Sequence, residues 1–164
     1  MALWAKSLLN ALLFFAIFMV ALPGAAHWLL PAALPLPHAL RVGVGGVLCI
    51  GGAAVWIYCL DIFSRSGRGT PFPLDAPRHL VTSGLHGVMR NPIMAGELAV
   101  IWGEALYLSS LGVFVYAAAI TLAGHLAVIY VEEPELRERF GAEYEAYCRR
   151  VPRWLPRRSA RHGS

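Results

Sequence analysis

Two polar clusters that could bind a small ligand stand at either end of one apolar segment. The first contains Arg90 and Asn91, and the second is the adjacent carboxylate pair Glu132 and Glu133. A guanidinium can hold a carboxylate through paired hydrogen bonds, and a carboxylate can hold an ammonium or hydroxyl groups. Apolar packing does not need such groups at a membrane boundary, whereas binding a zwitterionic ligand does. The pattern predicts a membrane enzyme.

The segment between the clusters predicts two membrane helices that form a hairpin. Its two apolar stretches, about 93–109 and 111–131, are separated only by a short turn at Ser109 and Ser110. Backbone at membrane depth must satisfy its own hydrogen bonds, so the chain is expected to cross the bilayer as a helix and return at once. The two polar clusters should therefore meet at one membrane face.

The composition places the whole chain in the membrane. Its 164 residues are 57% hydrophobic and only 15% charged, and the mean hydropathy is +0.56. Two further candidate spans lie at about 8–22 and 40–62. The first also resembles a signal peptide, but its phenylalanines suit a retained helix, and we expect it to be retained. We predict an all-α integral membrane bundle of about four transmembrane helices with a cytoplasmic C-terminal amphipathic helix.

A single domain over residues 1–164 is expected, with three parts. Residues 1–63 would supply the two N-terminal spans, residues 64–156 a cofactor-binding connector, the hairpin and a tail helix, and residues 157–164 a disordered basic tail. In the connector, residues 69–73 contain two prolines and a phenylalanine, which suit a lid or a rigid linker equally well.

The predicted tail helix begins near Pro134 and is amphipathic. Apolar and aromatic residues recur at spacings of about three and four, which places them on one helix face. These residues are Leu136, Phe140, Tyr144, Tyr147 and Val151. The helix is expected to lie along the membrane surface or beneath the spans.

Basic residues predict the orientation. If the N-terminus is cytoplasmic, all fourteen Lys and Arg residues except Arg41 lie on the cytoplasmic side. That bias places both termini and both polar clusters in the cytoplasm, at a bacterial-type inner membrane or another membrane that faces the cytoplasm. The net charge of +4 then suits lipid headgroups rather than nucleic acid.

The cysteines and histidines do not predict a metal site or a disulfide framework. The three cysteines have no metal-type spacing, and no two of the six histidines lie four residues apart. We therefore expect no metal, and the chain gives no sign of an obligate protein partner.

Four short motifs occur in order around the hairpin. They are Leu80-Val81-Thr82-Ser83-Gly84, Arg90-Asn91-Pro92 with Gly96, Glu132-Glu133-Pro134, and Phe140-Gly141 followed by Tyr144, Tyr147, Val151-Pro152-Arg153 and Pro156. Over about residues 67–156 the chain resembles the isoprenylcysteine carboxyl methyltransferase and phospholipid methyltransferase superfamily. The resemblance implies that S-adenosylmethionine binds at the cytoplasmic face and that the methyl acceptor is lipidic.

The resemblance and the chemistry of the side chains together suggest a cofactor site. Arg90 could hold the carboxylate of S-adenosylmethionine, Glu132 or Glu133 its ammonium or ribose, and Tyr144 or Tyr147 its adenine. The full set of expected cofactor-binding residues is Thr82, Gly84, Arg90, Asn91, Pro92, Gly96, Glu132, Glu133, Tyr144 and Tyr147. Alternatively, Arg90 pairs with the glutamates simply to anchor the hairpin.

This sequence departs from the superfamily's common pattern at two positions. Asn91 stands where histidine is frequent, and Met94 stands where tyrosine is frequent. Asparagine keeps hydrogen-bonding groups but does not titrate near neutral pH, and methionine lacks a hydroxyl. The identity of the acceptor and the route of any proton therefore stay open.

Four residues are candidates for the chemistry itself. Arg90 could position a carboxylate acceptor, which needs no base, whereas an amine or thiol acceptor needs one, and Glu97, His125 or Glu133 could serve. Glu97 and His125 are expected to lie level in the hairpin and to form a buried pair.

Two other functions fit parts of the pattern. A membrane sterol-type reductase would use NADPH, and a non-catalytic membrane protein or small transporter would use Glu97, Glu104 and His125 as a polar pathway.

Overall fold

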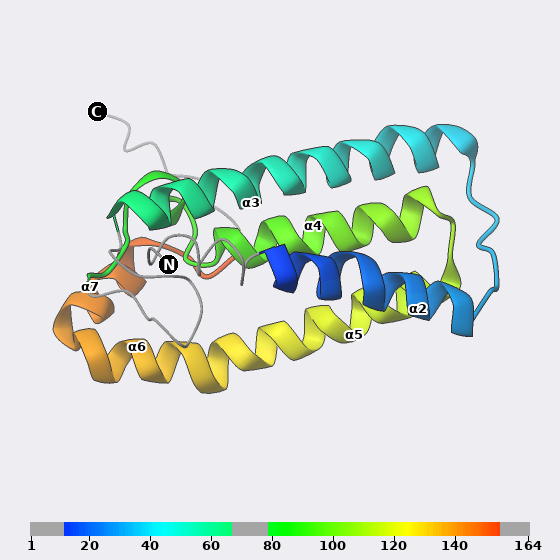
Figure 1. Ribbon diagram of the computed structural model, residues 1–164. Coiled ribbons are helices and arrows are strands. Elements are labelled where there is room, and N and C mark those ends of the chain that lie inside the picture. The colour runs from blue at the N-terminus through cyan, green and yellow to red at the C-terminus, as the bar shows by residue number, and fades with distance from the viewer. Residues whose placement is uncertain (1–11, 67–78, 155–164) are drawn as a thin grey trace, which may run out of the picture.

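Four apolar helical segments lie side by side along one axis, and two short helices close one end of the bundle (Figure 1). The computed structural model describes residues 12–66 and 79–154, and in these ranges it has helices and no named strand. The elements are η1 Ile17–Ala21, α2 Leu22–Leu29, η2 Leu40–Gly45, α3 Gly46–Ser66, η4 Gly84–Gly87, α4 Pro92–Tyr107, α5 Leu111–Ala127, η5 Val128–Glu132, α6 Glu133–Phe140 and α7 Ala142–Arg150.

Three helices are long and apolar enough to cross a membrane. They are Leu12–Leu29, Leu40–Ile62 and Leu111–Phe140. The remaining predicted span, 93–109, corresponds to α4, which has 16 residues and is therefore about 24 Å long, less than the ~30 Å of a bilayer's hydrocarbon core. Its burial against the other helices suits an inner member of the bundle. The all-helical architecture is confirmed, whereas a fourth full span is not.

The first long helix extends beyond its predicted span. The first continues through Pro23 to Leu29, well past residue 22, and a π-helical turn, Ile17–Ala21, directly precedes that proline. Local π turns help a membrane helix to accommodate a proline, which cannot donate a backbone hydrogen bond.

Close packing of α3 against α4 depends on small residues. A Cβ atom added to Gly52 would lie 2.5 Å from the carbonyl oxygen of Gly96, and one added to Gly96 would lie 2.8 Å from that of Gly52. One added to Gly45 would lie 3.0 Å from the carbonyl oxygen of Gly103. Gly43, Gly46 and Gly51, by contrast, face open space. Small residues let helix backbones approach where lipid gives little hydrophobic driving force, so the glycines on one face of this span serve tight packing.

The hairpin turn is fastened to the loop between the first two long helices. Ser109 has a positive φ of 54°, its hydroxyl donates to the carbonyl oxygen of Leu34 at 2.6 Å, and its own carbonyl accepts from the Leu34 amide at 2.7 Å. Ser110 caps α5 by accepting a hydrogen bond from the amide of Val113. These contacts hold the end of the bundle opposite to the two short helices.

The C-terminal segment is two helices rather than the single tail helix predicted from the sequence. Pro134 lies in the first turn of α6, as expected, but α6 continues the α5 helix and then stops at Gly141, whose φ is 51°. That backbone conformation favours glycine, so the helix breaks there and α7 starts in a new direction. The predicted apolar face still forms, since Tyr144, Tyr147 and Val151 pack with Leu136, Phe140 and Leu80.

Two predictions concern residues outside the described ranges. The lid or linker at residues 69–73 and the basic tail at residues 157–164 both lie there.

Candidate active site

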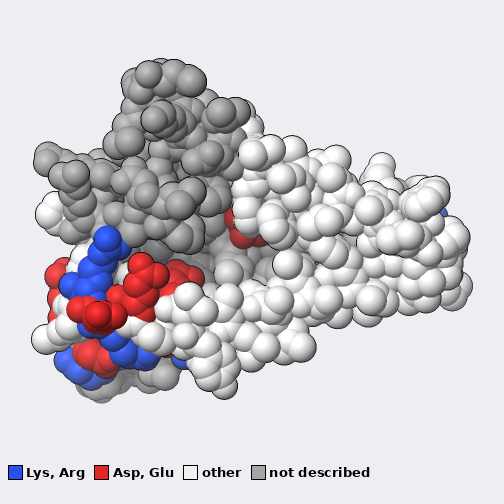
Figure 2. All heavy atoms as spheres, turned by 60° about the horizontal axis from the view of Figure 1, so that its bottom comes forward, with Lys and Arg blue, Asp and Glu red and all other residues white. Residues whose placement is uncertain are grey.

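Charged side chains gather at the end of the molecule formed by α6 and α7 (Figure 2). Among the described residues, the rest of the face in this view carries almost no charge. The two helices contribute Glu133, Glu135, Arg137, Glu138, Arg139, Glu143, Glu145, Arg149 and Arg150. The hairpin therefore brings Arg90 and the glutamate pair to one end, as the sequence predicted.

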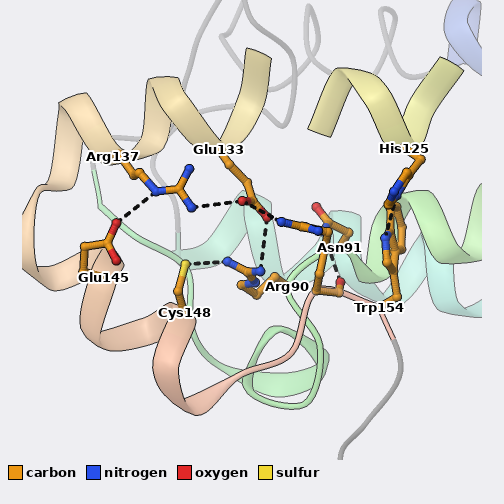
Figure 3. Close-up of polar contacts among 9 residues, drawn as sticks. Arg90, Asn91, His125, Glu133, Arg137, Glu145, Cys148 and Trp154 are labelled. Atoms are coloured by element: carbon orange, nitrogen blue, oxygen red, sulfur yellow. Dashed lines mark hydrogen bonds and ion pairs between the residues drawn. The ribbon is translucent and has the colours of Figure 1, made fainter. Parts of the chain in front are cut away.

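Glu133 is the centre of this polar end (Figure 3). Its side chain is only 3% exposed, and both of its oxygens are bound by arginines. Arg153 donates to Oε1 at 2.6 Å and to Oε2 at 3.0 Å, Arg137 lies 3.1 Å from Oε2, and Arg90 lies 3.2 Å from Oε1. Guanidinium groups in these positions compensate the buried carboxylate. Glu133 is therefore engaged within the protein itself.

Arg90 and Asn91 hold the segment that follows α7. The backbone amide of Arg90 donates to the carbonyl oxygen of Pro152 at 2.9 Å, and the Asn91 side chain donates to that of Arg153 at 3.1 Å. Arg90 also donates to the sulfur of Cys148. The arginine–asparagine motif thus joins the start of α4 to the C-terminal segment, so the anchoring interpretation of Arg90 is correct in part.

A pocket of about 410 Å³ opens beside this cluster. Volumes of a few hundred cubic ångströms are typical of small-molecule sites. Its charged lining lies at the polar end except for Glu97, and the rest of its interior is mainly apolar. The apolar and aromatic lining includes Phe14, Trp56, Leu60, Leu80, Val81, Ile93, Met94, Val131, Leu136 and Phe140.

Seven of the ten predicted cofactor-binding residues line this pocket. They are Arg90, Asn91, Pro92, Glu132, Glu133, Tyr144 and Tyr147. The two tyrosines are largely buried and pack with Leu136 and Phe140, and Glu133 is held by arginines. Glu132, unlike its neighbour, is solvent-exposed. Of the adjacent carboxylates, Glu132 is thus the one available to a ligand.

Three predicted cofactor-binding residues do not line the pocket. Thr82 and Gly84 lie in the connector, where Gly84 has a φ of 58° and packs against Tyr58 and Ile62 of α3. Gly96 faces α3 instead of the cavity. Its lack of a side chain serves helix packing, and that contact replaces the predicted approach of a ligand to the backbone.

Glu97 and His125 do not form the predicted pair. The indole N–H of Trp56 donates to Glu97 Oε1 at 3.0 Å, and that of Trp154 donates to His125 Nδ1 at 3.1 Å. Glu97 lines the main pocket, whereas His125 lies in a separate cleft with Leu98, Thr121 and Trp154. Each polar group inside the bundle is satisfied by a tryptophan instead of by the other.

Burial fixes the protonation of two side chains that join α7 to the connector. Burial raises the pKa of Tyr147 to about 12, so its hydroxyl keeps its proton and donates to the carbonyl oxygen of His86 at 2.6 Å. Burial also lowers the pKa of His86 to about 4, so the imidazole is neutral at physiological pH. Tyr147 and His86 therefore contribute no charge to the pocket lining.

Arg90 has a donor left for a ligand. Its Nη atoms contact Cys148 and Glu133, while its Nε atom is buried and has no hydrogen-bond partner among the described residues. A buried unpaired donor is costly, and a ligand's carboxylate at this position would satisfy it. With Glu132 for an ammonium and the apolar lining for an adenine, the residues present fit the chemical groups of S-adenosylmethionine.

Sequence reasoning missed Trp56 as a pocket residue. It lies four residues after Gly52, so both occupy the α3 face that packs on α4. The spacing of four and three through Gly45, Cys49, Gly52, Trp56 and Cys59 was the available signal. No comparable spacing in the sequence indicated that Arg153 would bind Glu133.

The structure is that of an apolar, helical membrane-type protein with a ligand-sized pocket at its charged end. The family model for phospholipid methyltransferase matches residues 40–143. The chain belongs to this family.

Two relatives show the range of acceptors in similar proteins. The chain is 36% identical over 70 residues, 43% of its length, to a phosphatidylethanolamine N-methyltransferase of Yarrowia lipolytica. It is 39% identical over 77 residues, 47% of its length, to methanethiol S-methyltransferase 2 of Bradyrhizobium diazoefficiens. The matches span only 7% and 29% of the lengths of these two relatives. No solved structure matches the chain.

Proposed function

We propose that this protein is an S-adenosylmethionine-dependent membrane methyltransferase that acts on an acceptor with a hydrophobic part. The observation that carries the proposal is the pocket itself, in which the buried Nε of Arg90 stands near the acidic Glu132 at the polar end of an apolar cavity. Family membership supports methyl transfer over the reductase and the non-catalytic alternatives.

The residues of the chain would mainly bind and align. S-adenosylmethionine, when bound, supplies a methyl group on a positively charged sulfur. Arg90 would hold its carboxylate, Glu132 its ammonium, and Leu136 and Phe140 would border its adenine. Methyl transfer is an in-line displacement, so fixing the two reactants and excluding water accounts for most of what the protein must do.

The acceptor would enter the apolar part of the cavity. The relatives' names include a lipid amine and a small thiol, and the resemblance to isoprenylcysteine carboxyl methyltransferases adds a carboxyl group. The excess of arginines near the polar end supports a cytoplasmic position for that end and for both termini, in keeping with the positive-inside rule.

A methyl-transfer assay tests the proposal. Purified protein in nanodiscs is given methyl-labelled S-adenosylmethionine and a set of decyl acceptors that carry an amine, a thiol or a carboxylate. We expect a labelled product from at least one acceptor, with turnover reduced tenfold or more in Glu132→Gln. Glu138→Gln is the matched control, because Glu138 is exposed and does not line the pocket. Absence of labelled product from every acceptor with folded protein would contradict the proposal.

A further inference from the structure

The deep part of the pocket contains one carboxylate, that of Glu97. Glu97 lies five residues into α4 from Pro92, so it is about 7.5 Å further along the helix axis than the start of α4. The residues around it in the pocket are apolar or aromatic, including Ile93, Met94 and Trp56. The other charged residues of the lining belong to the polar end, at positions 90, 132, 133, 135 and 139. A carboxylate this far inside an apolar cavity needs an explanation.

Trp56 orients that carboxylate without using all of it. The indole N–H donates to Oε1 at 3.0 Å, and Oε2 takes no part in this hydrogen bond. The indole ring is itself part of the pocket lining and stands on α3, across from Glu97. If the pair only tied α3 to α4, a neutral glutamine would do so equally well, since an amide oxygen can also accept from the indole.

A carboxylate in an apolar cavity suits a cationic ligand. Its oxygens accept strong, charge-assisted hydrogen bonds from an ammonium group. The same carboxylate would repel a second carboxylate, and charge repulsion is strong where water is excluded. The floor of the pocket therefore discriminates among the acceptors that the proposed function leaves open.

We propose that Glu97, oriented by Trp56, binds the nitrogen of an amine acceptor and selects amines over carboxylates. This inference rests on the proposed methyltransferase function. Glu97 accepts one proton from the bound ammonium, which leaves a neutral amine. The nitrogen lone pair then forms the N–C bond, while the methyl–sulfur bond of the sulfonium donor breaks and its electron pair stays on sulfur.

Ligand retention without any methyl donor tests the amine site. The full chain is placed in phosphatidylcholine nanodiscs, and the binding of radiolabelled decylamine and decanoate is measured above the background of empty nanodiscs. We expect saturable decylamine binding and little decanoate binding by the native chain. This comparison needs no variant, so it stands even if a substitution disturbs folding. Decanoate binding as tight as that of decylamine would overturn the proposal.

Two substitutions on one helix sharpen the test. Glu97→Gln should lower decylamine affinity tenfold or more, because it keeps the hydrogen-bond acceptor for Trp56 but loses the charge. Glu104→Gln makes the same change seven residues along α4, outside the pocket, and should leave binding unchanged. Unchanged decylamine binding by Glu97→Gln would overturn the proposal.

A parallel measurement of S-adenosylmethionine binding separates the two proposals. Cofactor binding together with decylamine binding that does not depend on Glu97 would reject the amine site alone. Decylamine binding that depends on Glu97, without cofactor binding, would support the amine site and reject the proposed function.

Discussion

Two adjacent carboxylates at the polar end have different environments. Glu133 is buried and bound by three arginines, whereas Glu132 is exposed and faces the pocket. The sequence predicted that the pair matters but could not say which member binds a ligand, because the helix rotation at a π-helical turn, Val128–Glu132, decides it. We infer that Glu133 maintains the architecture and that Glu132 contacts the cofactor.

Removing the charge of Glu133 should destabilise the protein. In Glu133→Gln, three arginines lose their common carboxylate, and breaking a buried ion pair costs roughly 3 kcal/mol. Thermal unfolding in detergent should show a clear decrease in Tm. Glu143→Gln, an exposed position on α7, is the control and should unfold like the native chain. Equal Tm values for the two variants would show that the cluster does not stabilise the fold.

His86 should make stability depend on pH. Its pKa is lowered to about 4 in the folded state from about 6.5 in the unfolded chain, so the unfolded state binds more protons between these values. Above pH 6.5 the imidazole is neutral in both states, and the unfolding free energy does not depend on its protonation. As the pH falls towards 4, protonation of the unfolded state lowers the unfolding free energy by roughly 3 kcal/mol. Unfolding free energies at pH 7 and pH 5 should therefore differ less in His86→Gln than in the native chain. His79→Gln, which changes an exposed histidine of the connector, should leave the difference as it is.

At the scale of elements, the contact between α3 and α4 positions the pocket. It places Trp56 opposite Glu97, and it is possible because Gly52 and Gly96 allow the backbones to approach. The sequence placed Gly96 among the expected cofactor-binding residues and could not identify it as part of this contact. A glycine at the start of a helix after a ligand-binding motif looks the same whether a ligand or another helix lies against it.

Two neighbouring glycines of α3 offer a direct test of this packing. Gly52→Ala would place its Cβ 2.5 Å from the Gly96 carbonyl oxygen, so the helices must separate, at a cost of about 1–3 kcal/mol. Gly51→Ala faces open space and should be neutral or slightly stabilising, since alanine favours helix. Thermal unfolding of both variants checks this. A Gly52→Ala protein as stable as Gly51→Ala would mean that the contact tolerates a wider spacing.

Sequence reasoning located the helices well but missed how the C-terminal ones turn. Apolar length placed Leu40–Ile62 correctly, because hydrophobic stretches of that length have few alternatives. It could not foresee that α6 would continue from α5 or that Gly141 would end it, since the residues on the two sides of Gly141 keep one helical spacing. Hydrogen bonds between residues far apart in the chain, such as that from Trp154 to His125, cannot be predicted from the sequence around either residue.

At the scale of the whole molecule, charge and pocket coincide at one end of an apolar bundle (Figures 1 and 2). In the proposed function, this arrangement would let a water-soluble cofactor and a hydrophobic acceptor each enter from its own phase. It also gives the short α4 a role, because its first residue marks the polar end and Glu97 lies further inside. The family of the chain and its geometry thus support the same function.

Calorimetric titration of S-adenosylmethionine into the detergent-solubilised protein tests the central claim most directly. We expect saturable binding by the native chain, weakened tenfold or more in Glu132→Gln and unchanged in Glu138→Gln, since only the former residue lines the pocket. Folding of each variant is checked by its unfolding profile. No saturable binding by folded native protein, or equal binding by both variants, would contradict the account.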